Sequence, residues 1–380
     1  MKKISITLLL IAACAFLFSC QNESVEKSNP EPKKVEEGYT KKENKLDTYS
    51  TTKEGDYSLF HFHDPFEENG YILEVDKNSN VLAKAEITDP SFAASISYPF
   101  KDSVYFVSGG YAEDSRLLTY KKDRQKFSYL DTKLEDQYID KFHKNEQGTY
   151  ITTLMDSNNS NQLCDIEINR CIRASDQLFF HSISSLDNNL ITVSINPDME
   201  DNKIELKKYN LELKEVDKKS INGTLSYFTY TDKDLYLYLF LTNGKIIRID
   251  KNLNNETINL NLEKLNLDDA SKIENVEYGR IYQMSETKFA IDIAVPINTE
   301  MKQTNIGVIT INNDRLTLDI LKDTKNKESI INADKETNEL YTRYYQNDKG
   351  FINIYDNDTL KLKNTLKLKN NDPIYYVDPQ

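Results

Sequence analysis

Short apolar runs alternate with polar turns along most of this chain, from about residue 46 to the end. The runs are rich in Ile, Val, Leu, Tyr, Phe and Thr, and the segments between them are rich in Asn, Asp and Lys. Runs of this length and composition are typical of β-strands bounded by turns. No long segment shows a helical period, so the pattern predicts little helix.

A phrase of strands and turns recurs seven times. Each copy has an apolar strand, a polar turn, a strand that ends in an aliphatic residue or Tyr followed by Asp or Asn, another turn and a third strand. The first copy places its strands at 57–62, 71–76 and 81–87. The seven copies begin at residues 57, 104, 150, 190, 235, 289 and 340.

Further short apolar stretches lie between these phrases, and each is expected to supply the first strand of the next unit. They cover residues 93–98, 138–142, 178–184, 225–230, 276–284 and 329–331. Four strands per unit at this spacing are typical of the blades of a β-propeller. A four-stranded sheet cannot bury both faces alone, whereas radial packing buries each sheet against its neighbours. The prediction is an all-β fold, a seven-bladed β-propeller of four-stranded antiparallel blades.

Closure of the ring involves two candidate strands at the ends of the folded part, Leu46–Thr52 and Ile374–Val377. One of them is surplus to seven inner strands. We expect Ile374–Val377 to pair into the same blade as the N-terminal strands and so close the ring. The alternative is a loose C-terminal tail.

The clearest copy of the phrase runs from Leu340 to Lys361 and contains Asn347-Asp-Lys-Gly350 followed by Phe351-Ile-Asn-Ile-Tyr-Asp356. It resembles the YVTN-type repeat of quinoprotein-like and lactonase-like bacterial propellers. The resemblance implies a fold over about residues 45–380. It implies neither quinone binding nor lactonase activity, because propellers host both enzymes and interaction modules. The other six copies are degenerate, so no catalytic residue is carried over.

The N-terminal segment has the pattern of a secretory signal. Lys2 and Lys3 precede an uncharged apolar stretch, Ile4–Phe18, which is short for a membrane span and is followed by polar sequence. No twin arginine is present, which favours the general secretion route.

The apolar stretch ends at Leu17-Phe18-Ser19-Cys20, which resembles the lipoprotein box of bacteria, in which the Cys receives lipid. Phe18 stands where that family usually has a small residue. We predict lipid attachment at Cys20, because the sequence turns polar immediately after it. A competing box, Ile11-Ala-Ala-Cys14, and an ordinary cleaved signal with Cys20 as a bystander remain open.

The segment after Cys20 has mixed charge, Pro30 and Pro32, and almost no apolar residues, so it cannot bury enough surface to fold. A flexible chain of this length has an end-to-end distance of roughly 25–30 Å. We therefore expect a lipoprotein signal peptide at 1–19, the lipidated Cys and a flexible tether at 20–45, and the propeller at 46–380. The expected location is the bacterial cell envelope, anchored by lipid (palmitate or a similar acyl chain) on the extracytoplasmic side of the membrane.

The composition and the absence of known motifs exclude several classes of function. The chain has 48 Lys+Arg against 61 Asp+Glu, a net charge of -13, which argues against nucleic-acid partners because phosphates require cations. The 24 Tyr and 16 Phe argue against wholesale disorder. No nucleophile elbow, His-Glu-x-x-His motif, Walker loop or dinucleotide fingerprint is present. No catalytic residue and no cofactor are therefore predicted.

Cys164 and Cys171 are the only cysteines beyond the leader. If Glu167 and Ile168 form the tip of a hairpin, the two cysteines fall opposite each other at a separation that a disulfide can bridge. A disulfide is permitted outside the cytoplasm. The alternative is two free thiols on different faces, because the tip lacks Gly and Asn.

The four histidines do not predict a metal site. His61 and His63 share one face of a strand, but a metal needs three or four converging ligands. His143 and His181 are expected at the ends of inner strands, near the mouth of the ring. Two segments, Asp76–Asn80 and Asp250–Asn254, begin like calcium loops but lack the later Gly and Glu, so turns stabilised by their Asp side chains are expected instead.

These observations favour a non-enzymatic binding or scaffold module that contacts a protein or envelope partner. One alternative is an extracellular hydrolase or lyase acting on envelope or carbohydrate substrates, with inward-facing carboxylates or histidines as acid and base. Another is a small-molecule-binding sensor subunit for a neighbouring membrane complex. An enzyme predicts inward polar side chains that converge in one funnel, and a scaffold predicts an exposed aromatic patch on one face.

Overall fold

The computed structural model describes residues 40–44, 55–62, 70–87, 92, 96–107, 116–132, 138–154, 162–174, 179–195, 203–232, 235–242, 244–265, 276–297, 300–312, 315–322, 324–325 and 327–380. All of them belong to the compact unit Tyr39–Gln380. The leader, Cys20 and the candidate strand Leu46–Thr52 lie outside the described residues.

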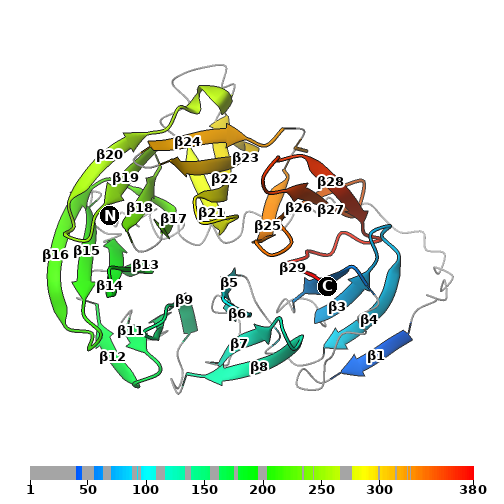
Figure 1. Cartoon of the computed structure of the whole chain (residues 1–380), viewed down its shortest axis with the longest axis horizontal. Helices are drawn as coiled ribbons and strands as arrows, with labels where there is room; N and C mark the ends of the chain where they lie inside the picture. The colour runs from blue at the N-terminus through cyan, green and yellow to red at the C-terminus, as the bar shows by residue number, and fades with distance from the viewer. Residues whose placement is uncertain are drawn as a thin grey trace, which may run out of the picture. The chain divides into compact units, whose positions relative to one another are not determined.

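The described part of the chain is a seven-bladed β-propeller, as the repeats predicted. Figure 1 shows the blades following one another around a ring in chain order; the first strand is innermost in blades 2 to 7, and the C-terminal strand is innermost in blade 1. Blade 2 contains β5 (Ile96–Phe100), β6 (Ser103–Val107), β7 (Arg116–Lys121) and β8 (Lys126–Asp131). Blade 3 contains β9 (Tyr138–Lys144), β10 (Thr149–Leu154), β11 (Gln162–Asp165) and β12 (Arg170–Arg173). Blade 4 contains β13 (Phe179–Leu186), β14 (Asn189–Ile195), β15 (Lys203–Tyr209) and β16 (Glu215–Asn222).

Blades 5, 6 and 7 have the same antiparallel order, and blade 1 is described last. Blade 5 contains β17 (Leu225–Asp232), β18 (Tyr236–Leu241), β19 (Lys245–Ile249) and β20 (Asn255–Asn259). Blade 6 contains β21 (Glu277–Gln283), β22 (Lys288–Ile297), β23 (Glu300–Asn312) and β24 (Arg315–Ile320). Blade 7 contains β25 (Ser329–Asp334), β26 (Glu339–Gln346), β27 (Lys349–Asp356) and β28 (Leu362–Lys367). Blade 1 joins the C-terminal β29 (Tyr376–Pro379) to β2 (Tyr57–His61), β3 (Gly70–Val75), β4 (Val81–Ile87) and β1 (Thr40–Asn44).

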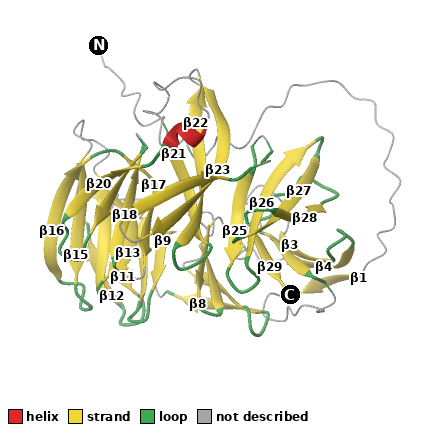
Figure 2. Ribbon diagram, turned by 45° about the horizontal axis from the view of Figure 1, so that its top comes forward, coloured by secondary structure: helices red, strands yellow, loops and turns green. Residues whose placement is uncertain are grey.

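Helix is almost absent from these residues, as predicted. Figure 2 shows strands throughout and a single short helix, the 3-10 turn η2 (Leu262–Leu265) between blades 5 and 6. Within the described residues, no helix has the length and apolar character needed to cross a membrane.

The core consists of seven apolar clusters in the described residues, one between each pair of neighbouring blades. Strand β18 shows why its sequence is apolar at every position. Leu237 and Leu239 pack in the cluster shared with blade 4, whereas Tyr238 and Phe240 pack in the cluster shared with blade 6. Because successive side chains point to opposite faces and both faces are covered, the run has no polar alternation.

The outermost strands have the opposite character. Strand β16, Glu-Val-Asp-Lys-Lys-Ser-Ile-Asn, is exposed along most of its length. An outer strand has an unpaired edge, and charged side chains on it disfavour pairing with another molecule. The outer edge of blade 1 is different, because β1 pairs there in parallel with β4. The last residues of the segment assigned to the tether therefore form a strand, because an open edge of a sheet provides backbone partners that the isolated segment lacks.

The C-terminal strand closes the ring, which confirms the prediction for the chain's end. Strand β29 pairs antiparallel with β2, so blade 1 combines the two ends of the folded chain (Figure 1). The side chain of Asn332 in blade 7 binds the backbone of Val377 twice. Its Nδ2 donates to the carbonyl oxygen at 2.9 Å, and its Oδ1 accepts from the amide nitrogen at 2.9 Å. Tyr120 of blade 2 donates to Asp378 from the other side at 2.7 Å.

The Asp that follows β3 in blade 1 and the Asp that follows β19 in blade 5 stabilise the turn to the next strand. Asp76 Oδ1 accepts the amide N–H groups of Asn78 and Asn80 at 2.9 and 2.8 Å. Asp250 makes the same bonds to Asn252 and Asn254 at 2.8 Å each. These bonds confirm the prediction of Asp-stabilised turns at the two calcium-like segments.

Candidate functional site

A β-bulge recurs in the innermost ladder of several blades. In blades 3, 4, 6 and 7 the pairing of the first strand with the second shifts at one place. A bulge inserts an extra residue and redirects side chains, and bulges are frequent next to functional sites. The residues that the shifts leave out of the register are Asp140, His181, Gly279 with Arg280, and Ile331.

The bulge of blade 6 sets two residues of β21 against one residue of β22. Tyr278 pairs with Ile293 and Ile281 pairs with Ile291, so Gly279 and Arg280 both lie opposite Asp292. A Cβ atom on Gly279 would lie 2.8 Å from the Cβ of Asp292, which is closer than real Cβ atoms approach. Glycine at 279 therefore allows Asp292 to lie against the bulge.

Four polar side chains form what we call the central cluster: Arg280, Tyr282, Asp292 and Arg343. Arg280 donates a hydrogen bond to Tyr282, its neighbour two positions along the same strand. Asp292 Oδ1 accepts the backbone N–H of Ile330, which belongs to the inner strand of blade 7, at 3.1 Å. The cluster thus joins blades 6 and 7.

Arg343 is held in place by blade 1. Its Nη1 donates to the carbonyl oxygen of Ile374 at 2.7 Å, and its guanidinium carbon lies 5.4 Å from the centre of the Tyr375 ring. Both contacts fix the side chain, because guanidinium groups stack favourably on aromatic faces. Blades 6, 7 and 1 therefore all contribute to the position of the cluster.

Burial controls the ionisation of the cluster. Burial raises the pKa of Asp292 to about 7, and the Ile330 N–H, Arg280 and Arg343 only partly offset that effect. Burial also raises the pKa of Tyr282. For Arg280 burial acts to lower the pKa, but Tyr282 and other groups outweigh it, and the net pKa is raised. The cluster therefore carries two fixed positive charges beside a carboxyl group that titrates near neutral pH.

The cluster is only partly exposed to solvent. Arg280, Tyr282 and Asp292 are surrounded by protein on most sides, yet each side chain remains partly accessible to solvent. Tyr98 on the inner strand of blade 2 also acts electrostatically on Arg280 of blade 6. Since these blades are not neighbours in the ring, the guanidinium group of Arg280 extends toward the ring axis, where propellers have their central channel.

A second polar group occupies the bulges of blades 3 and 4. Lys141 Nζ donates to Asp140 Oδ1 at 2.8 Å, and the charge of Lys141 also acts on His181. Burial is the main reason that the pKa of His181 falls to about 4, with Lys141 adding to the effect. Near neutral pH this histidine is uncharged, so the Asp140–Lys141 pair has no net charge next to it.

The structure places His143 in β9 and His181 in β13, close to the ends of inner strands as predicted. The ring of His143 stacks near Tyr150, with 6.3 Å between centroids, and burial lowers its pKa to about 4. His61 is buried in β2, where its Nδ1 lies 2.8 Å from the carbonyl oxygen of Pro373. His63 lies outside the described residues. No group of three or more potential ligands in the described ranges is arranged to hold a metal.

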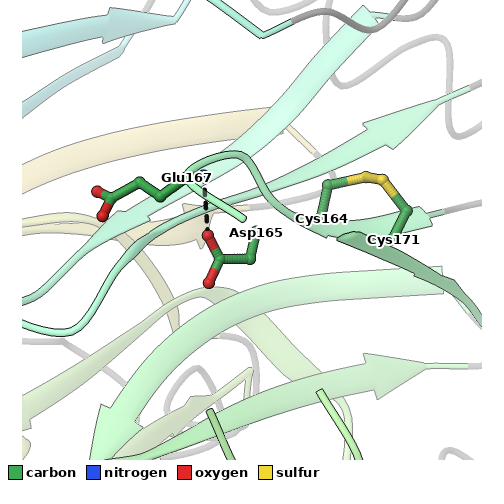
Figure 3. Close-up of a disulfide and its surroundings, with 4 residues drawn as sticks. All are labelled: Cys164, Asp165, Glu167 and Cys171. Atoms are coloured by element: carbon green, nitrogen blue, oxygen red, sulfur yellow. Dashed lines mark hydrogen bonds between the residues drawn. A yellow bond between two sulfur atoms is a disulfide. The ribbon is translucent and has the colours of Figure 1, made fainter. Parts of the chain in front are cut away.

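Cys164 and Cys171 are joined by a disulfide at the tip of blade 3 (Figure 3). They are direct cross-strand partners of β11 and β12. The turn between them is stabilised by Asp165, whose Oδ1 accepts the N–H of Glu167 at 3.0 Å. The turn spans residues 166–169, and Asn169 at its end has the left-handed backbone conformation that Asn tolerates, with a φ of 51°.

The sequence analysis did not identify the central cluster. The signal for Asp292 was a single acid inside the apolar run Phe289-Ala-Ile-Asp-Ile-Ala294, and for Arg280 it was a Gly-Arg pair in the middle of an apolar inner strand. A charge within a strand whose two faces are both covered must either be paired or face the axis of the ring. The bulge that brings Arg280 and Asp292 together cannot be recognised from the sequence.

No family model matches the sequence, and no curated protein matches it. Among solved structures, the chain is similar to a 6-phosphogluconolactonase candidate from Bacteroides uniformis, with 12% identity, a TM-score of 0.51, and coverage of 84% of this chain and 98% of that one. A functionally unknown protein from Desulfotomaculum acetoxidans aligns with 10% identity, a TM-score of 0.50 and coverage of 82% and 95%. A Lactobacillus plantarum protein aligns with 10% identity, a TM-score of 0.48 and coverage of 85% and 98%. At such identities the likeness shows the fold alone, and it agrees with the propeller resemblance of the repeats.

Proposed function

We propose that this protein is an extracytoplasmic β-propeller, anchored to the bacterial cell membrane by lipid on Cys20, that acts as a binding module for a protein or envelope partner. The observation that carries the binding role is the central cluster, in which Arg280 and Arg343 from two blades both act on Asp292 and remain partly accessible to solvent. A few converging polar groups are typical of binding sites. The anchor is supported by the leader and by the Leu17–Cys20 box.

Metabolic labelling with an alkyne-modified palmitate tests the anchor in a bacterial host that processes lipoproteins. The full chain and a Cys14→Ser variant are expected to carry the label and to fractionate with membranes. A Cys20→Ser variant is expected to lose both. Loss of the label from Cys14→Ser instead would assign the anchor to the competing box. Absence of the label from all three proteins would refute lipid attachment and indicate an ordinary cleaved signal.

Crosslinking in intact cells, followed by purification of the full chain, tests the binding role. The expected result is capture of one partner together with no turnover on a panel of envelope and carbohydrate substrates.

An enzymatic function is the second candidate, and Asp292 favours it specifically. A carboxyl group with a pKa of about 7 beside two arginines can give or take a proton near neutral pH. Turnover on any substrate of the panel that disappears in Asp292→Asn would establish a hydrolase or lyase and end the non-enzymatic proposal.

A further inference from the structure

The central cluster contains two arginines and a single acid, Asp292, whose charge acts on both of them. In the part of the chain that the structure describes, no carboxylate forms an ion pair with Arg280 or Arg343, whose direct partners are neutral oxygens of Tyr282 and Ile374. Arg248 on β19 of blade 5 is different, because it pairs with Glu256 at 2.7 Å. In a chain with 13 more acids than bases, two arginines beside one acid are a local reversal of charge.

A carboxylate or phosphate group fits this arrangement. Guanidinium groups donate several N–H bonds in a fixed plane and bind such oxyanions with two parallel bonds. Arg343 uses one of its nitrogens on the Ile374 carbonyl and is stacked on Tyr375, so its remaining donors are held in a fixed direction. An ordered guanidinium loses less entropy when it binds a ligand.

The polar neighbours of the two arginines are also suitable for an anion. Tyr282 has a hydroxyl group beside Arg280; this group is protonated at neutral pH, and burial raises its pKa further. Asp292 is the only acid of the central cluster, and its Oδ1 is already bonded to the Ile330 N–H. In its protonated form this carboxyl group neither repels an anion nor cancels the positive charge.

We infer that the central cluster is a binding site for a small organic anion, whose carboxylate or phosphate group is held between Arg280 and Arg343. The inference rests on the proposed binding function and names the chemical class of its ligand. Arg280 and Arg343 supply the charge, Tyr282 supplies a hydroxyl donor, and Asp292 weakens binding when it ionises.

Calorimetric titration of the full folded chain at low salt tests the inference with D-galacturonate, with D-galactose as its uncharged counterpart, and with sulfate and inorganic phosphate. Binding is expected for the charged probes and not for galactose. Preference for galacturonate over the inorganic anions would assign a carboxylate ligand, and the reverse preference a phosphate ligand. Equal binding of galactose, or no binding of any charged probe at millimolar concentration, would refute the site.

Arg280→Gln is the direct variant and is expected to weaken binding at least tenfold, since a charge-assisted hydrogen bond is lost. Arg280→Lys keeps the charge and is expected to weaken binding less, which separates a lost contact from a misfolded chain. Arg248→Gln removes an arginine from the outer part of blade 5 and is expected to bind as the unmodified chain does. Unchanged affinity in Arg280→Gln would refute the inference.

A pH series with sulfate, whose charge is constant over the range, adds a second readout. The charged and titratable groups that act on Asp292 are Arg280, Tyr282 and Arg343 from blades 6 and 7. Sulfate affinity is expected to fall from pH 6 to pH 8, and Asp292→Asn is expected to abolish that fall. Partner capture in intact cells is scored separately, so capture without anion binding refutes only this inference, and anion binding without capture refutes only the partner.

Discussion

Replacing Asp292 by Asn is expected to change how the stability of the fold depends on pH. The folded chain raises the pKa of this carboxyl group from the ordinary 3.8 to about 7, chiefly by burial. The folded state therefore holds the proton more tightly than the unfolded chain. The group's stabilising contribution is complete below about pH 4 and is lost as the pH rises to about 7.

The size of the effect follows from the two pKa values. A tenfold difference in proton affinity corresponds to about 1.4 kcal/mol, so a change from 3.8 to about 7 corresponds to roughly 4 kcal/mol. Asn keeps the size and the acceptor oxygen for Ile330 but does not ionise. The free energy of unfolding of Asp292→Asn minus that of the unmodified chain is therefore expected to rise by up to roughly 4 kcal/mol between pH 4 and pH 7.

Urea denaturation at a series of pH values measures this difference, followed by tyrosine fluorescence because the chain has 24 Tyr and no Trp. Subtracting the two curves removes the contributions of other titrating groups. Asp378→Asn is the matched comparison, since burial raises the pKa of Asp378 to about 6 and its curve should level off at a lower pH. A difference for Asp292→Asn that stays constant from pH 4 to pH 8 would refute the assignment of a buried, proton-holding carboxyl group.

Three further changes test other parts of the fold. Replacing Cys164 and Cys171 by Ser removes a disulfide that closes a loop with a sequence separation of 7. The free energy of unfolding is expected to fall by roughly 2.5 kcal/mol, and the melting temperature with it. Reductant is expected to have no further effect on this variant. Asn332→Ala leaves the buried amide and carbonyl groups of Val377 without their side-chain partner, at a cost of roughly 2–4 kcal/mol in urea denaturation. His143 has its pKa lowered to about 4 by burial, so its stabilising contribution is present above pH 6.5 and is lost as the pH falls toward 4. His143→Phe is accordingly expected to lose less stability than the unmodified chain over that range, and equal losses would contradict this account.

The fold could be predicted because its repeats use the same local chemistry seven times. Apolar strands recur at a regular spacing, and Asp76 and Asp250 mark the same turn in different blades. Both signals are local in the sequence, so they can be recognised in a single sequence without an alignment of relatives. The closing role of the C-terminal strand also follows from a count of strands, because a ring needs one inner strand for each blade.

The central cluster could not be predicted in the same way. Arg280 and Arg343 are 63 positions apart in the sequence and come from different blades, so their convergence depends on the radial packing of whole sheets. The bulge at Gly279 then decides which side chain faces Asp292. A register shift of one residue reverses the direction of the side chains. The positions of apolar residues along the sequence do not show where such a shift occurs.

Because β29 closes the ring, the ring can be completed only after the end of the folded chain has been synthesised. Residues 376–379 are synthesised after the other strands that the structure describes, so the inner strand of blade 1 is the last to be made. The contacts of β29 with β2 and with Asn332 form only when that last segment has emerged. If the chain is exported as proposed, the ring can close only after residues 376–379 have crossed the membrane.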